Sequence, residues 1–365
     1  MRAEPETFIG QEDLEAIALG APILGTGGGG DPYIGKLIAR QAISGGKQVR
    51  MIGLRQVPDR ALVIASAMMG APTVFVEKVP SGEEAVTAFL ALQEFLGEQA
   101  YATYSIEAGG LNSTIPIGTA AKLGIPLIDA DGMGRAFPEI QMVSPTLYNI
   151  PAAPMALADE KGDVVILQHT ITNLWTERLA RSVTIDMGGS AMIALYPMTG
   201  KQAKKALIAG SISFARRIGN RLIKAWRTRT DPLEAILNET KGYLAFRGKI
   251  TDLERRTERG FAQGSVKLSG IDENKGKEMV VHFQNENLIA ELDGKVLVSV
   301  PDLIAMVDTE TSVPVTTEAL RYGLRVAVIA IPCHSKWRSV RGLEVVGPAY
   351  FGYDSPYWPV ERRLG

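Results

Sequence analysis

The glycine run in GTGGGGDP, residues 25–32, constrains the fold more than any other segment. Five of the six residues from 25 to 30 are glycine, which loses more chain entropy on folding than other residues and offers no side chain for packing. Asp31 followed by Pro32 is typical of a helix N-cap and a first helical residue. Amides at such a helix start can hold a carboxylate, a phosphate or a developing oxyanion. We therefore expect a substrate-binding turn made by Gly27, Gly28, Gly29, Gly30 and Asp31.

Two other interpretations of this run stay open. Gly25, Gly27 and Gly30 satisfy the dinucleotide-binding pattern G-x-G-x-x-G, but that motif follows a strand and is followed by an acid about 20 residues later. Here the preceding segment has helical spacing, and Arg50 and Arg55 lie where the acid would be. The second interpretation is a tight turn that close packing alone requires.

The order of apolar segments predicts the fold class. In the first half, short apolar runs alternate with helix-like stretches, which is typical of β-α units and a mostly parallel sheet. After about residue 170, helical segments are followed by closely spaced strand candidates, with Asp293-Gly294 as a hairpin turn. Because 365 residues exceed the usual size of a single core, we expect two domains. Residues 8–170 are predicted to form an α/β domain with the glycine loop, and residues 171–355 an α+β, strand-rich domain.

Charge and composition narrow the expected partners. A formal net charge of -1 supplies no long-range field for nucleic acid. The N-terminal segment is acidic where a signal peptide needs a basic start, and no apolar stretch reaches membrane-spanning length. We expect a cytoplasmic protein whose partners are a small-molecule substrate and further copies of the chain in a homo-oligomer, without nucleic acid or membrane.

Metal-binding and nucleophilic residues are few. Cys333 is the only cysteine, so a disulfide within the chain is excluded. The three histidines are His169, His282 and His334, and a zinc site would have to combine them with carboxylates or Cys333. The sequence contains no motif that requires a cofactor, and a divalent metal such as zinc is an open alternative. Cys333 and His334 are adjacent, so on a strand they point in opposite directions and cannot form a nucleophile-base pair.

A carboxylate pair follows the apolar run 125–128. Asp129 and Asp131 are two residues apart, so on an extended strand they share a face. Ligands of open α/β sheets bind at the carboxyl ends of strands, which favours a cleft here with Arg135 as a clamp for an anion. The alternative is an acid-rich turn that caps the next helix.

Three further segments carry candidate site residues. EAGGLNS, residues 107–113, places Glu107 and Asn112 after another strand candidate, although Asn112 could serve only as an N-cap. MGAPTVFVEK, residues 69–78, adds Lys78, for which a surface ion pair is the alternative. HFQNEN, residues 282–287, gathers hydrogen-bonding groups between apolar strands. There a period of two puts His282, Gln284 and Glu286 on one face beside Asn285, and a purely structural histidine is the alternative.

The segments ILGTGGGGDPY, MGAPTVFVEK, EAGGLNS, DADGMGRAFPE, HFQNENLIA, VPDLI, LRYGLRVAVI and VGPAYFGYD occur in this order along the chain. Together they resemble the S-methyl thiohydantoin desulfurase family, over about residues 8–355. The resemblance implies a hydrolase that removes sulfur, as methanethiol, from an S-methylated five-membered ring and leaves a hydantoin.

The roles of individual residues are hypotheses from their chemistry. Asp129 or Asp131 would be the base, since neighbouring carboxylates raise each other's pKa, and the glycine amides would stabilise negative charge. His282 or Glu286 would protonate the departing group, and Arg135 or Lys78 would pair with a substrate carboxylate. The alternatives are a nucleotide- or anion-binding regulatory module and a metal-dependent amidohydrolase that opens a hydantoin ring.

Overall fold

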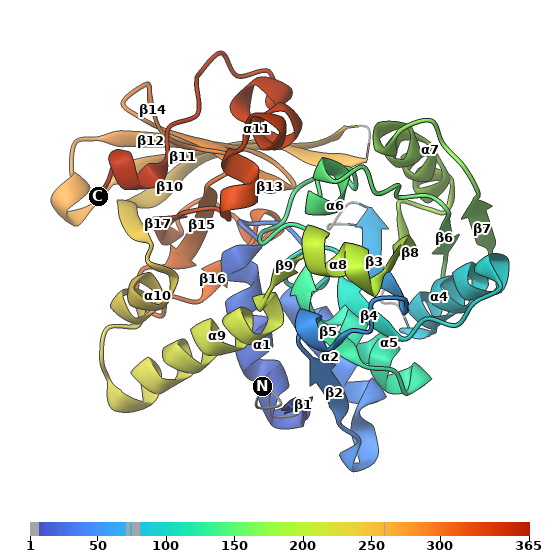
Figure 1. Ribbon diagram of the computed structural model, residues 1–365. Helices are drawn as coiled ribbons and strands as arrows, with labels where there is room; N and C mark the ends of the chain where they lie inside the picture. Colours follow the sequence, from blue (N-terminus) through green and yellow to red (C-terminus); the bar gives the residue numbers. More distant parts are fainter. Residues whose placement is uncertain (1–6, 71–73, 75–80, 259) are drawn as a thin grey trace.

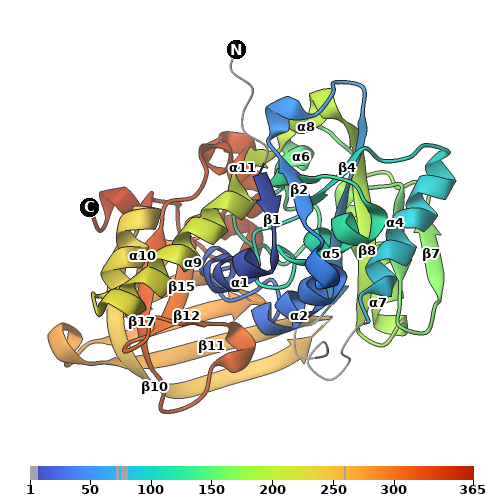
Figure 2. The same cartoon turned by 90° about the horizontal axis from the view of Figure 1, so that it is seen from below.

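The computed structural model describes residues 7–70, 74, 81–258 and 260–365. Its strands form two sheets, each covered by helices on at least one face (Figures 1 and 2). In the first sheet the strand order is β1-β2-β5-β4-β3-β8-β6-β7, and β9 pairs with β5. The strands are β1 (Thr7–Ile9), β2 (Val49–Ile52), β3 (Leu62–Gly70), β4 (Ala102–Ser105), β5 (Leu127–Asp131), β6 (Met155–Ala158), β7 (Val164–Leu167), β8 (Ser190–Thr199) and β9 (Ile208–Ala209).

The centre of this sheet is parallel. Strands β2, β5, β4 and β3 run in the same direction and pair in parallel, whereas every pairing that involves β1, β8, β6, β7 or β9 is antiparallel. The predicted mostly parallel N-terminal sheet is thus confirmed for the central strands, and the complete sheet is mixed. The carboxyl ends of the parallel strands β4 and β3 meet at one edge, which carries residues 105–112 and 68–70.

The second sheet is entirely antiparallel, in the order β14-β13-β12-β11-β10-β17-β15-β16. Asp293 and Gly294, both with positive φ (48° and 76°), join β13 to β14, as type I′ hairpin turns require. The predicted strand-rich second half is confirmed. The strands are β10 (Tyr243–Glu258), β11 (Phe261–Gly270), β12 (Glu278–Gln284), β13 (Glu286–Leu292), β14 (Lys295–Ser299), β15 (Leu303–Asp308), β16 (Pro314–Val315) and β17 (Arg325–Ile331).

The helices follow local capping signals. Asp31 accepts a hydrogen bond from the Tyr33 amide at 2.7 Å and begins α2 with Pro32 in its first turn, as its sequence predicts. The helical stretch between residues 200 and 228 is divided into two helices, because the chain forms β9 and turns at Gly210, whose φ is 83°. The helices are α1 (Gln11–Leu24), α2 (Pro32–Ala42), α4 (Glu83–Leu96), α5 (Ile115–Leu123), α6 (Ser144–Leu147), α7 (Asn173–Asp186), α8 (Gly200–Ala206), α9 (Ser211–Thr228), α10 (Pro232–Thr240) and α11 (Val340–Val346).

The two sheets share one large apolar core. Its buried residues run from Leu24 in α1 through Tyr104 in β4 to Leu288 and Ile329 in the second sheet. The segment after residue 170 returns to the first sheet before the second one begins, since β8 pairs with both β3 and β6. No helix in the described part of the chain is long and apolar enough to cross a membrane.

Candidate active site

The glycine loop, residues 25–30, is buried and connects α1 to α2. It packs backbone against backbone on the second glycine turn, Gly109–Gly110. The carbonyl oxygen of Gly29 accepts the Leu111 amide at 2.8 Å, and a Cβ added to Gly29, whose φ is +77°, would lie 2.4 Å from the Gly109 Cα. Close packing therefore accounts for part of the glycine requirement, and it brings the two predicted glycine segments together.

Glu286, the first residue of β13, fills the space beside the loop. A Cβ on Gly28 would lie 1.9 Å from the Glu286 Oε1 atom, and the Gly29 amide donates a hydrogen bond to the Glu286 carboxylate. The Gly28 amide is used by the Gly25 carbonyl oxygen at 2.9 Å. At least part of the anion-holding capacity expected of this loop is thus directed at a carboxylate of the protein itself.

Glu107 follows the carboxyl end of β4 and is fixed by its neighbours. Asn112 Nδ2 donates to Glu107 Oε1 at 2.6 Å, and the Phe137 amide donates to the same carboxylate. The Asn112 Oδ1 atom accepts the Met68 amide at 2.8 Å. Asn112 therefore connects the end of β3 to Glu107, which is a positioning role rather than the N-cap role considered above.

The two glutamates influence each other electrostatically. Burial raises the pKa of Glu286 well above its ordinary value; negative charge on Glu107 raises it further and the Arg135 guanidinium opposes the increase. Burial also raises the pKa of Glu107, to about 7, against the lowering effect of its hydrogen bonds and of Arg135. Near neutral pH the pair therefore holds at least one proton.

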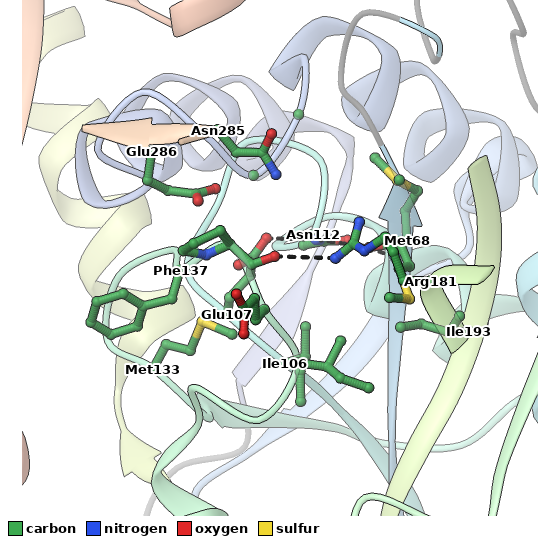
Figure 3. A pocket seen from close by; sticks show the side chains of 17 residues that line it. Met68, Ile106, Glu107, Asn112, Met133, Phe137, Arg181, Ile193, Asn285 and Glu286 are labelled. Carbon is green, nitrogen blue, oxygen red and sulfur yellow. Dashed lines mark hydrogen bonds between the residues drawn. The ribbon is translucent and has the colours of Figure 1, made fainter. Parts of the chain in front are cut away.

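Both glutamates line one cavity together with the loop (Figure 3). The cavity encloses about 50 Å³, or about 510 Å³ when the open space at its mouth is included. Gly29 and Gly30, Asn112 and Asn285 contribute to the wall. The lining also includes apolar residues, three of them methionines, namely Met68, Met69, Ile106, Met133, Phe137, Ile140 and Ile193. The cavity thus combines a carboxyl pair with apolar surface suited to a small, largely apolar ring.

Arg135 is fully buried, and its N–H groups are occupied by the protein. Nε donates to the Ala136 carbonyl oxygen at 2.9 Å, Nη1 to the carbonyl oxygens of Pro301 and Asp302, and Nη2 to Thr26 Oγ1 and the Asn287 carbonyl oxygen. A guanidinium has five N–H groups, so none is left for a substrate anion. The arginine instead ties the glycine loop to the second sheet, in place of the substrate clamp expected from the sequence.

The aspartate pair on β5 does not line the cavity. Asp129 accepts hydrogen bonds from the Ser213 amide at 3.0 Å and from its hydroxyl at 2.5 Å, which caps the first turn of α9. Asp131 Oδ1 accepts the amides of Met133 and Gly134 at 3.2 and 2.7 Å. Neither aspartate lines the cavity or caps the next helix in the sequence, since Asp129 caps α9 and Asp131 accepts hydrogen bonds within its own turn.

His282 lies at another site. It lines a separate groove with Gln284 and Tyr353, and its Nε2 atom is 3.9 Å from Glu291 Oε2. The expected shared face of residues 282, 284 and 286 is not formed, because the chain reverses at Asn285, whose φ is 56°, and Gln284 pairs with Glu286 across the turn. The turn places Glu286 at the cavity and leaves His282 outside it.

The other predicted site residues have separate positions. Asn285 lines the cavity, with its Oδ1 atom accepting the Ala262 amide at 2.9 Å. Asp31 is the N-cap of α2, and Gly27 packs against Asn287 and Thr317. Lys78 lies outside the described residues.

Two charged residues of the cavity wall are absent from the predicted site. Arg181 lines the cavity and forms a buried ion pair at 2.7 Å with Glu177, four residues earlier on α7. The i,i+4 spacing of opposite charges was a visible signal. Glu139 also lines the cavity, and it accepts a hydrogen bond from the Tyr350 hydroxyl at 2.8 Å.

Cys333 is a buried thiol away from the cavity. Its Sγ atom lies 3.5 Å from Arg338 Nε and 3.8 Å from the Tyr357 hydroxyl. Burial raises the pKa of this thiol to about 12, and negative charge on Asp302 adds to the increase, so it stays protonated at neutral pH. Within the described residues, no three histidine, cysteine, aspartate or glutamate side chains are grouped as a metal site would need.

Comparison with known proteins identifies the family. Residues 12–169 match the family model of the S-Me-THD-like N-terminal domain, and residues 171–360 match that of the S-Me-THD-like C-terminal domain. The chain is also similar to a protein from Chromobacterium violaceum of known crystal structure, with 26% identity and a TM-score of 0.81 over 97% of this chain and 100% of that one. No curated protein matches. With the two family models covering nearly its entire length, this chain belongs to the S-Me-THD-like family.

Proposed function

We propose that this protein is a hydrolase that replaces the S-methyl sulfur of a five-membered thiohydantoin ring by oxygen, giving a hydantoin and methanethiol. The activity comes from the family resemblance. The observation that carries the chemistry is the carboxyl pair, Glu107 and Glu286, which faces one small cavity and holds at least one proton near neutral pH.

In the first step, the oxygen of a water molecule bonds to the ring carbon that bears sulfur. Glu107, as the carboxylate, takes a proton from the water, and Glu286, as the acid, gives its proton to the ring nitrogen, whose double bond to that carbon becomes a single bond. Asn112 and the Phe137 amide hold Glu107 in place for this task.

In the second step, the carbonyl group forms and the C–S bond breaks, with its electron pair leaving on sulfur. The hydroxyl proton of the intermediate passes to Glu286, and the proton held by Glu107 passes to the sulfur, which leaves as methanethiol. The two protons of the water molecule end on nitrogen and sulfur, and both glutamates return to their starting states. The Gly29 amide stabilises Glu286 while it is a carboxylate between the steps.

The alternative of a nucleotide- or anion-binding module has less support. The glycine loop faces the Glu286 carboxyl group, and the Gly29 amide is already used by it. A phosphate in this position would lie beside two glutamates, and Arg135 would have no free N–H group to donate to it.

The test is an assay of the purified full-length chain with S-methyl thiohydantoins. Release of methanethiol, measured with a thiol reagent, should match the formation of hydantoin, measured by chromatography. Absence of both products above the buffer rate, with well-folded protein and a range of ring substituents, would contradict the proposal. Stabilisation by nucleotides in the same preparation would favour the anion-binding module.

A further inference from the structure

The outermost strand of the first sheet, β7, has a free edge. It pairs with β6 on one side, and no described strand lies on its other side. Figures 1 and 2 both show β7 at the end of the molecule, with α4 and α7 close to it. Its sequence is Val-Val-Ile-Leu. An apolar edge strand without protecting charges is a template for another strand, and soluble proteins normally cover such an edge.

The helices that contact β7 also expose large apolar side chains. Val164 of β7 is 41% exposed, Leu90 and Phe95 of α4 are 46% and 43% exposed, and Trp175 and Leu179 of α7 are 42% and 43% exposed. Trp175 and Leu179 are four residues apart and share one face of their helix. Exposed apolar side chains on the two helices that contact a free strand edge are consistent with an interaction surface.

The register between β6 and β7 determines which backbone groups of β7 are free to pair with another strand. The Asp159 amide donates to the Asp163 carbonyl oxygen at 3.2 Å at the start of the β6–β7 ladder. Antiparallel ladders alternate between bonded and non-bonded pairs, so Val164 and Ile166 fall in the non-bonded pairs and direct their amide and carbonyl groups away from β6. Continuing the strand by two residues gives Gln168 the same orientation.

These outward groups fit the same strand of a second copy. In antiparallel pairing about a two-fold axis at Ile166, that residue lies opposite itself and Val164 lies opposite Gln168, so every outward residue meets an outward residue. The same register places Asp163 opposite His169 at both ends, and both side chains are exposed in the single chain. An imidazole N–H is a suitable donor for a carboxylate.

We propose that the chain forms a symmetric dimer in which β7 pairs antiparallel with β7 of a second copy, so that one continuous sheet crosses both molecules. The two-fold arrangement satisfies both free edges with identical residues and closes the assembly at two copies.

The first test is the mass of the full-length chain in solution, by light scattering or sedimentation velocity at micromolar concentrations. We expect twice the chain mass of 39.3 kDa. Ile166→Pro removes an outward amide without removing a bond to β6, and it should give a folded species of single-chain mass. Val340→Lys, at an apolar residue that is 79% exposed elsewhere, is the matched control and should stay dimeric. A monomeric wild type, or a folded Ile166→Pro variant that stays dimeric, would overturn the proposal.

A charge exchange provides a second test that does not depend on the proline variant. His169→Asp places two carboxylates opposite each other twice in the dimer and should weaken dimerisation roughly tenfold, given the usual size of cross-strand charge effects. The exchange variant Asp163→His with His169→Asp should restore the wild-type dimer. If the single change leaves dimerisation unaltered, or the exchange fails to restore it, β7 does not pair in this register and the proposal is wrong.

Discussion

Asp129 and Asp131 are two residues apart on one strand, whereas Glu107 and Glu286 come from different sheets, and only the second pair lines the cavity. The difference lies in what surrounds each carboxyl group. Asp129 is occupied by the first turn of α9, and Asp131 is hydrogen-bonded within its own turn. Asp131 Oδ2 and Glu286 Oε2 are both buried without a partner among the described residues, but only Glu286 lines the cavity. Position relative to the cavity, rather than closeness in the sequence, therefore separates the two pairs.

The sharpest way to break this comparison is to neutralise each acid in turn. Glu107→Gln and Glu286→Gln should each lower the turnover of S-methyl thiohydantoins by about 10²- to 10⁴-fold, the usual effect of removing a general acid or base. Asp129→Asn is the matched control and should keep a near wild-type rate. Steady-state kinetics with folded protein checks this. A severe loss in Asp129→Asn, with full activity in both glutamine variants, would reverse the assignment.

Gly28→Ala should have the next largest effect. Its Cβ would lie 1.9 Å from the Glu286 Oε1 atom, so the carboxyl group must move away from the Gly29 amide. We expect a loss of roughly 1–3 kcal/mol in the free energy of unfolding, as for other overpacked sites, together with a strong loss of turnover. Denaturant unfolding and kinetics measure the two effects.

Gly118→Ala is the control for this glycine substitution. It lies in α5, and its added Cβ would make only ordinary contacts at 3.7 and 3.9 Å. It should be neutral or slightly stabilising. Equal behaviour of the two alanine variants would show that the close approach of Glu286 to the loop is unimportant.

The pH dependence gives a finer test of which glutamate is the base. Since Glu107 must be a carboxylate to accept a proton and its pKa is about 7, kcat/KM should fall by about tenfold for each pH unit below that value. Glu107→Gln should remove this inflection from its residual rate. An unchanged inflection in that variant would assign the titration to another group.

The ionisation of Glu107 should also make the free energy of unfolding depend on pH, in a direction that its pKa shift fixes. Because the pKa of Glu107 is raised from 4.5 to about 7 on folding, the folded state binds a proton that the unfolded state has released in this range. The free energy of unfolding should therefore decrease as the pH rises from about 4.5 to 7. Thermal unfolding at several pH values should show a weaker decrease in Glu107→Gln than in the wild type.

The smallest effect is expected at Asp129. Asp129→Asn keeps an oxygen that can accept from Ser213 but loses the negative charge at the start of α9, so it should cost at most about 1 kcal/mol of stability. Denaturant midpoints measured beside Ser213→Ala would show whether the two changes act on one interaction. A change of several kcal/mol would indicate that Asp129 does more than cap this helix.

Many residues of the site could be predicted from the sequence, but the contacts between them could not. The sequence indicated Glu107, Asn112, Asn285 and Glu286, and they lie around one cavity with Gly29 and Gly30. Arg135 was assigned to substrate because a guanidinium after an acidic turn suggests an anion clamp, and its carbonyl partners at residues 301 and 302 are invisible without the fold. His282 and Glu286 were placed on one face because the reversal at Asn285 has no strong turn signal of its own.

By itself, the sequence determined the alternation of strands and helices, the N-cap at Asp31, the hairpin turn at Asp293-Gly294 and the need for glycine in residues 25–30. These features depend on interactions between residues close in the chain, or on which side chains the backbone can accommodate. Only the tertiary structure decided which acid meets the glycine loop and which is used to cap a helix. That choice depends on contacts between the two sheets and on burial, which shift pKa values and occupy hydrogen-bond donors in ways that no local pattern encodes.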